Sequence, residues 1–401
     1  MPDAHLYSRA KLFSKVGKRT PIVARFSTSS SRAGAPPATH NEAFGLAVRF
    51  KTGEGNWDLL SVNFPQSAAP YPMKTPDSTH RADENPTNNL PDANVGMDYL
   101  VSNQEALQTR LWQFSDISIP NDWRMMTTFT GCSLSLINDR GKTYHVRFTV
   151  KAKRKHRYMD AEVAKYLRSN IPDYYFRDLY TSIERGDFPE WNLIAQILTP
   201  EVMKKIDFDP FDISKLWDEK IFPEIHLGRI VLNENPVNWY SQIEQLSLSP
   251  GNLVPGIEPS PVRIQQARIF LYKDAHYARL GANHRFLETN RATEERILQF
   301  VTVNVHQSAM VVHIPTITLV LSFTPRPNPM TIENSTPVNA TWNSFSWQEQ
   351  ERIIQRMSRS VIKADENLQI RLLRHLKIAN RDYCEKLWAN LNLRLNPCRE
   401  T

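Results

Sequence analysis

The chain has 401 residues, 41% of them hydrophobic and 23% charged, which is ordinary for a globular protein of about two or three domains. Its net charge of +7 favours anionic ligands or partners in general without choosing among them. The three cysteines, Cys132, Cys384 and Cys398, are too few and too widely spaced to indicate a disulfide framework or a metal-ligand set. This favours a reducing, intracellular compartment.

Short β-rich segments bounded by polar or turn residues dominate the chain from Pro21 to about Asn233. They are 21–28, 45–51, 57–64, 132–138, 144–152, 191–198 and 228–233. Helical patterns interrupt the series at 160–170 and 177–185. Strands this numerous predict an antiparallel barrel or sandwich.

The second half of the chain changes from strands to helices. Residues 235–263 form a proline-punctuated connection that must run over a surface. A helix is predicted over 264–281, and amphipathic helices are predicted from 347 to 391 as a separate appendage. The most apolar stretch, 300–323, contains two histidines and a proline, so no membrane span is expected.

The helix predicted over 264–281 carries the most informative group of side chains. Arg268, Tyr272, His276 and Arg279 are spaced by four, four and three residues, so all lie on one face. Positive charge one and two turns from a tyrosine favours its phenolate, a hard anionic ligand suited to ferric iron. The alternative is a solvated basic face with one amphipathic tyrosine, and spacing alone favours that alternative.

Two further basic features are weaker signals. Arg25 lies inside the strong strand 21–28, and an inward arginine needs an anionic partner, either a ligand's acid group or a protein carboxylate. The run KAKRKHR (151–157) has the charge of a nucleic-acid patch, but no aromatic residues interleave with it. We interpret it as a solvated loop and expect no nucleic-acid partner.

Longer motifs connect these features. The segment RIFLYKDAHYARLG (268–281) resembles the signature of the haem catalases, in which an arginine precedes the haem-ligand tyrosine by one turn and a second arginine follows it. GKRTPIVARFST (17–28) resembles the family's strand with a propionate-binding arginine and a serine that supports the distal histidine. Further ordered matches are 53–65, 114–120, 208–217 and 228–263. The likeness runs from about Leu6 to Arg291 and returns weakly in the C-terminal helices.

The resemblance implies an α+β fold in three parts. An eight-stranded antiparallel β-barrel is expected in 1–234, a wrapping segment with the ligand helix in 235–342, and a C-terminal helical domain in 343–401. It also implies a homotetramer that holds haem b and converts hydrogen peroxide to water and oxygen.

Functional residues are carried over by position. Tyr272 would be the proximal iron ligand, and Arg268 would keep it deprotonated. Arg25 and Arg279 would bind the haem propionates, and His276 shares their helix face as a further cofactor-binding residue. Ser27 would lie on the distal side of the haem.

The distal side departs from the family pattern. The family's distal histidine belongs to a segment before the part that matches Leu6, and we expect it to be absent here. The position of the distal asparagine falls on Val62, while Asn63 would point to the opposite face of the strand. Valine can neither move a proton nor orient peroxide, so weak dismutation is predicted. The alternative is a repurposed haem protein, such as a fatty-acid hydroperoxide isomerase like the catalase-related allene oxide synthases.

Three expectations concern other parts of the chain. NADPH-binding catalases have Trp-Pro-His where this chain has Trp217, Asp218 and Glu219, which argues against retained NADPH. Residues 292–326 diverge from the family pattern, and a frame-shifted gene is the explanation we prefer. A peroxisomal or cytoplasmic location is expected, although the last residues are not a Ser-Lys-Leu address.

Overall fold

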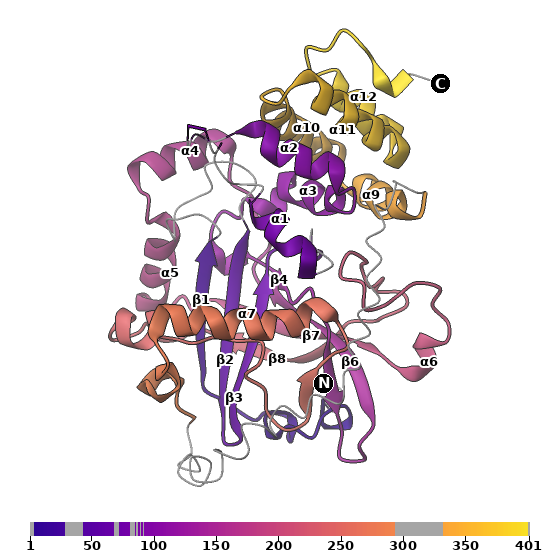
Figure 1. Cartoon of the computed structure of the whole chain (residues 1–401). Helices are drawn as coiled ribbons and strands as arrows, with labels where there is room; N and C mark the ends of the chain where they lie inside the picture. Colours follow the sequence, from indigo (N-terminus) through magenta and orange to yellow (C-terminus); the bar gives the residue numbers. More distant parts are fainter. Residues whose placement is uncertain are drawn as a thin grey trace.

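The computed structural model describes residues 4–28, 43–67, 72–80, 92–292 and 332–399, with a few single positions between 85 and 90. Within these residues one curled antiparallel sheet is flanked by helices, which confirms the α+β class (Figure 1). Its strands are β1 (Ile22–Thr28), β2 (Phe44–Thr52), β3 (Gly55–Val62), β4 (Thr128–Phe129), β5 (Leu134–Ile137), β6 (Thr143–Ala152), β7 (Glu190–Leu198), β8 (Ile225–Val231) and β9 (Ile257–Pro259).

The order of the strands can be compared with the predicted eight-stranded barrel. One path runs β1-β2-β3-β4-β6-β5-β9, and β7 pairs with both β6 and β8. The short strands β4 and β9 were not predicted, because two or three residues give no periodic pattern. Among the described residues β1 pairs with β2 and β8 with β7, so closure into a barrel stays a prediction.

Alternation along the strands gives the sheet two different faces. Phe44, Leu46 and Val48 on β2 point into a core, where Phe50 stacks on Trp57 at 4.7 Å between ring centroids. The intervening residues of β2, Gly45 and Ala47, are only half-buried. We call the side that carries Arg25, Ser27, Gly45, Ala47, Leu60, Val62 and Phe129 the open face of the sheet.

Helices cover this scaffold on several sides. α4 (Ala161–Asn170) and α5 (Tyr174–Glu184) flank one side, and Asp160 caps α4 by accepting hydrogen bonds from its first turn. α7 (Arg263–Leu280) runs across β1, β2 and β3 in Figure 1, and it ends where Gly281 adopts a φ of 84°. The short helices α1 (Thr75–His80) and α6 (Pro200–Met203) complete this part.

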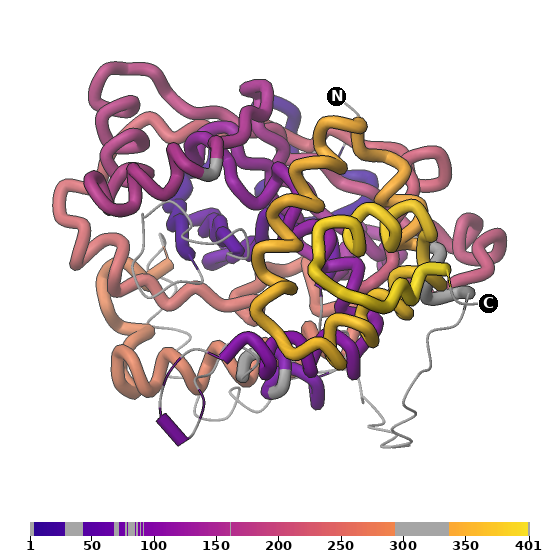
Figure 2. Tube along the Cα trace, turned by 90° about the horizontal axis from the view of Figure 1, so that it is seen from above, coloured from indigo at the N-terminus to yellow at the C-terminus, as the bar shows by residue number. Residues whose placement is uncertain are grey.

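A second hydrophobic core lies among helices at one end of the sheet. The helices are α2 (Ala93–Ser102), α3 (Ala106–Phe114), α9 (Ile332–Ser344), α10 (Trp347–Val361), α11 (Glu366–Ala379) and α12 (Arg381–Trp388). Trp342 stacks on Tyr383 in its centre at 4.2 Å. Figure 2 shows the C-terminal helices coiled together on one side of the chain, next to α2 and α3. The predicted domain 343–401 therefore shares its core with residues far earlier in the sequence.

The cysteines are a correction to the sequence analysis. Cys384 of α12 and Cys398 form a disulfide with a Cα–Cα distance of 5.9 Å, whereas the cysteine spacing had indicated no disulfide framework. Cys132 remains free and buried. The widely spaced pattern concealed a pair only 14 residues apart, which the turn after α12 brings together.

Two predictions about the apolar stretch of the chain cannot be compared with this structure. Residues 293–326 of the stretch predicted to diverge, including 300–323, lie outside the described residues. In the part of the chain that is described, no helix combines the length and the apolar character needed to cross a bilayer.

Candidate functional site

A row of side chains crosses the open face where the first four strands pair. Ser27 on β1 lies opposite Gly45 on β2, Gly45 opposite Val62 on β3, and Val62 opposite Phe129 on β4. Directly opposed residues point to the same side of a sheet, so this row shares one face. A Cβ at Gly45 would lie 2.5 Å from the Ser27 hydroxyl oxygen, so a larger residue would push that hydroxyl aside.

Val62 and Asn63 lie on opposite faces. Val62 is 39% exposed on the open face, whereas Asn63 is fully buried. The Asn63 amide oxygen accepts from the backbone N–H of Phe44 at 2.9 Å, and its nitrogen donates to the carbonyl of Ile117 at 3.3 Å. The side chain of Asn63 is therefore committed to the fold, and the register leaves Val62 as the residue beside Ser27 and Gly45.

The predicted helix face is assembled on α7. Arg268 lies one turn before Tyr272, with its guanidinium carbon 5.6 Å from the centre of the tyrosine ring. The rings of Tyr272 and His276 meet edge to face at 6.5 Å. Tyr272 is partly exposed, and its neighbours on this face contact the sheet and the segment that precedes α7. Tyr272 therefore lies on the side of α7 that is turned toward the sheet.

Arg25 and Arg279 come together around one carboxylate. Arg25 Nη2 on β1 lies 2.9 Å from Glu244 Oε2, and Arg279 Nη1 lies 3.4 Å from Glu244 Oε1. Arg279 also donates to the carbonyl of Leu246 at 2.6 Å. Burial and the charge of Arg25 lower the pKa of Arg279, although Glu244 acts in the opposite direction. Two guanidinium groups from distant parts of the chain thus form an anion-binding position, and a protein carboxylate occupies it.

His276 is held by protein groups, and its predicted part in cofactor binding stays a prediction. It is buried, and its Nε2 lies 2.7 Å from the carbonyl oxygen of Leu248, to which it donates. Its Nδ1 lies 3.4 Å from Arg279 Nη2. Burial lowers the pKa of His276, and the Leu248 carbonyl only partly offsets this. A neutral His276 therefore fixes α7 to the wrapping segment, and both ring nitrogens already have partners.

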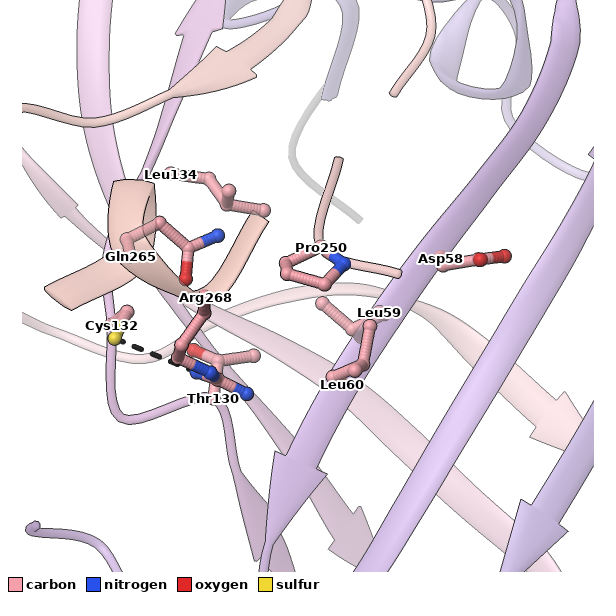
Figure 3. A pocket seen from close by; sticks show the side chains of 9 residues that line it. All are labelled: Asp58, Leu59, Leu60, Thr130, Cys132, Leu134, Pro250, Gln265 and Arg268. Atoms are coloured by element: carbon pink, nitrogen blue, oxygen red, sulfur yellow. Dashed lines mark hydrogen bonds between the residues drawn. The ribbon is translucent and has the colours of Figure 1, made fainter. Parts of the chain in front are cut away.

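Arg268 reaches a residue that the sequence analysis had not assigned. Its Nη1 lies 3.6 Å from the sulfur of Cys132, as the dashed line in Figure 3 marks. Burial alone would lower the pKa of Arg268, but interactions with Tyr272 and Cys132 raise it above its ordinary value. The cation between the tyrosine and the thiol is thus stabilised by both.

A buried ion pair holds the wrapping segment against the open face, and sequence reasoning also missed it. Arg49 on β2 and Asp58 on β3 lie opposite each other and make two hydrogen bonds of 2.7 Å. Asn290, which follows α7, accepts from Arg49 at 2.7 Å. Asp58 also accepts from the backbone N–H of Ser249 and from the amide of Asn252. A charged residue inside each apolar strand was the available signal, but alternation alone does not identify the partner.

These residues suit a flat, mostly apolar ligand with acidic side groups. Ala47 and Gly45 are small and leave space over the open face, and Leu60 and Val62 supply apolar surface. The paired arginines lie at the β1 edge, where a ligand carboxylate could replace Glu244. Tyr272, between Arg268 and Arg279 in the sequence of α7, carries a phenol oxygen that could ligate a ferric ion. The arrangement fits haem with two propionates.

Comparisons with known proteins agree with this chemistry. A family model described as Catalase matches residues 1–317. The chain is 39% identical over 298 residues to a catalase from Danio rerio, covering 74% of this chain and 56% of the relative. It is 40% identical over 288 residues to a catalase from the Onchocerca volvulus endobacterium, covering 72% and 60%. The chain thus spans a little over half the length of the curated relatives it matches.

Solved structures show the same similarity in three dimensions. A fungal catalase matches with a TM-score of 0.86 at 27% identity, and a bacterial catalase with 0.84 at 28%. Each alignment covers 97% of this chain and 83% of the solved chain. The family match to residue 317 also includes most of the stretch 292–326 that the sequence analysis set apart as divergent.

Proposed function

The chain belongs to the catalase family, and from this premise we propose that it binds haem b against the open face of the sheet and acts on hydrogen peroxide. The observation that carries the proposal is the convergence of Arg25 and Arg279 on one carboxylate, with Tyr272 two turns before Arg279 on α7. Haem carries two propionates, and a pair of arginines is well suited to hold them. A tyrosine oxygen can serve as the ligand of its iron.

Each residue has a definite task in this proposal. Tyr272 would ligate the iron, and the Arg268 guanidinium carbon lies 5.6 Å from the centre of its ring. Arg25 and Arg279 take the propionates, with Glu244 displaced from them. His276 holds α7 in position through the Leu248 carbonyl. Ferric haem, when bound, supplies the redox chemistry of peroxide decomposition.

The distal residues determine what the site does with a peroxide. Ser27 presents a hydroxyl on the open face, and Val62 beside it offers no hydrogen bond. Decomposition of hydrogen peroxide needs a proton to pass from one oxygen to the other and a donor that orients both. We therefore expect peroxide turnover at least ~10²-fold below that of a member with a complete distal set.

Val62 also favours a second function, the isomerisation of organic hydroperoxides. Val62, Leu60 and Phe129 make the row beside Ser27 apolar, which suits an acyl chain better than water or hydrogen peroxide. Val62→Asn separates the two functions. It should raise oxygen evolution from hydrogen peroxide by about tenfold, the value of one positioned hydrogen bond, and should lower turnover of a fatty-acid hydroperoxide.

Tyr272→Phe tests the haem site itself. The purified chain should show the absorption of a ferric tyrosinate complex, and this variant should lose it. Tyr277→Phe is the matched control, because Tyr277 is an exposed tyrosine on the same helix. An unchanged spectrum in Tyr272→Phe, or the same loss in Tyr277→Phe, would refute Tyr272 as the ligand.

Assembly and location complete the proposal. We expect a homotetramer with haem, an intracellular and either peroxisomal or cytoplasmic location, and no NADPH. Size-exclusion chromatography with detection at the haem absorption band measures assembly and cofactor together. A monomeric protein that carries haem would contradict the predicted tetramer but not the proposed haem site.

A further inference from the structure

The region beside Arg268 contains a small hollow between β3, β5 and α7. Its lining includes Cys132, Arg268 and Gln265 among apolar side chains. The hollow is small, about 20 Å³, which is room for a water or a hydrogen peroxide molecule.

Gln265 is the independent sign that a polar molecule belongs in the hollow. It is only 4% exposed, yet its side-chain amide makes no hydrogen bond with any residue that the structure describes. In Figure 3 this amide points toward Arg268. Asp58, the acidic group of the lining, is already bonded to Arg49. The amide of a buried residue that has no hydrogen-bond partner among the described residues is costly, so a small ligand with donors and acceptors would stabilise it.

Cys132 supplies a reactive atom at the same place. Its sulfur lies 3.6 Å from Arg268 Nη1, and a neighbouring cation is typical of the cysteines that react with oxidants. A second cation is near: burial lowers the pKa of Arg147 to about 10, while its interaction with Cys132 acts in the opposite direction. Cys132 is therefore not in the purely apolar environment that makes buried cysteines inert.

We propose that this hollow is a second peroxide site, in which hydrogen peroxide held by Gln265 and Arg268 oxidises Cys132 to a sulfenic acid. The sulfur attacks one peroxide oxygen, so an S–O bond forms as the O–O bond breaks. Sulfur loses two electrons, and the departing oxygen takes the thiol proton and leaves as water. The proposal takes hydrogen peroxide from the proposed function and holds whether or not haem binds at Tyr272.

The experiment exposes the folded full chain to hydrogen peroxide, removes the peroxide, and then traps the sulfenic acid with dimedone as the chain is unfolded in urea. Peptide mass spectrometry then gives the rate of adduct formation at Cys132, with Cys132→Ser as the blank. Gln265→Ala should slow this rate about tenfold, the loss expected for one buried hydrogen bond to a reacting group. Gln266→Ala is the matched control: Gln266 is the next residue of α7 and bonds to the Ser260 carbonyl instead. Its rate should equal that of the wild type.

Two results would overturn the proposal. One is no adduct in the folded wild type at a peroxide concentration that labels Cys132 in the urea-unfolded chain, a comparison that needs no variant. The other is equal rates in Gln265→Ala and Gln266→Ala. Tyr272→Phe should keep the Cys132 adduct while losing the haem spectrum, so failure of the haem site and failure of the thiol site are told apart.

Discussion

The buried ion pair between Arg49 and Asp58 allows a sharp prediction about stability. The two side chains are 1% and 0% exposed, and Asp58 accepts hydrogen bonds from four donors. Asp58→Asn keeps the size of the side chain but removes its charge and directs an NH₂ group at donors. Because Arg49 is then a buried cation without an anion, the free energy of unfolding should fall by about 3–5 kcal/mol. That is a large part of the total free energy of unfolding of a folded domain, which is typically about 5–15 kcal/mol.

Urea unfolding followed by tryptophan fluorescence measures this loss, because Trp57 is buried on the neighbouring position of β3. Glu224→Gln is the control: it breaks the exposed pair of Glu224 with Lys151 and should cost less than about 1 kcal/mol. The double variant Arg49→Met, Asp58→Leu should recover most of the loss, since no unpaired charge is left. Equal losses in Asp58→Asn and Glu224→Gln would refute the reasoning.

Three further predictions concern other parts of the fold. Cys398→Ser should lower the free energy of unfolding of the helical core by about 3 kcal/mol. A reducing agent should lower the free energy of unfolding of the wild type by the same amount and leave that of the variant unchanged. Asn63→Ala should cost about 2 kcal/mol in unfolding free energy because two backbone groups lose their partner, whereas Val62→Ala should cost far less. Burial raises the pKa of Glu349 above its ordinary 4.5, so the folded state binds the proton more tightly and stability falls as pH rises past that value. Glu349→Gln should flatten this part of a plot of melting temperature against pH; an unchanged slope would contradict the assignment.

Local patterns in the sequence predicted the parts of this structure that depend on local rules. Alternation located the long strands, and the spacing of four, four and three residues put Arg268, Tyr272, His276 and Arg279 on one helix face. Alternation also predicted that Val62 and Asn63 point to opposite sides of β3. These relations follow from the geometry of one helix or one strand, so no distant residue can alter them.

Such local patterns could not predict which residues from distant parts of the chain would contact each other. Arg25 was known to need an anion, but Glu244 lies 219 residues away and nothing local connects the two. The same holds for α2 and α3, two helices that were not predicted and that share a core with the C-terminal helices. Periodicity states that a face is buried, and only the three-dimensional path of the chain determines against what.

The open face combines residues that hold the fold, at one end of β2 and β3, with residues that would hold a ligand farther along the same strands. On β3, Asp58 belongs to the buried network, while Leu60 and Val62 farther along the same face are partly exposed. On β2, Arg49 belongs to the network, while Ala47 and Gly45 are half-buried. The network fixes one end of the face to Ser249 before α7 and to Asn290 after it, and so holds α7 across the strands. Changes at Val62 should therefore alter chemistry with little effect on stability, whereas loss of Asp58 should weaken folding and ligand binding together, as expected of a site supported by a rigid scaffold.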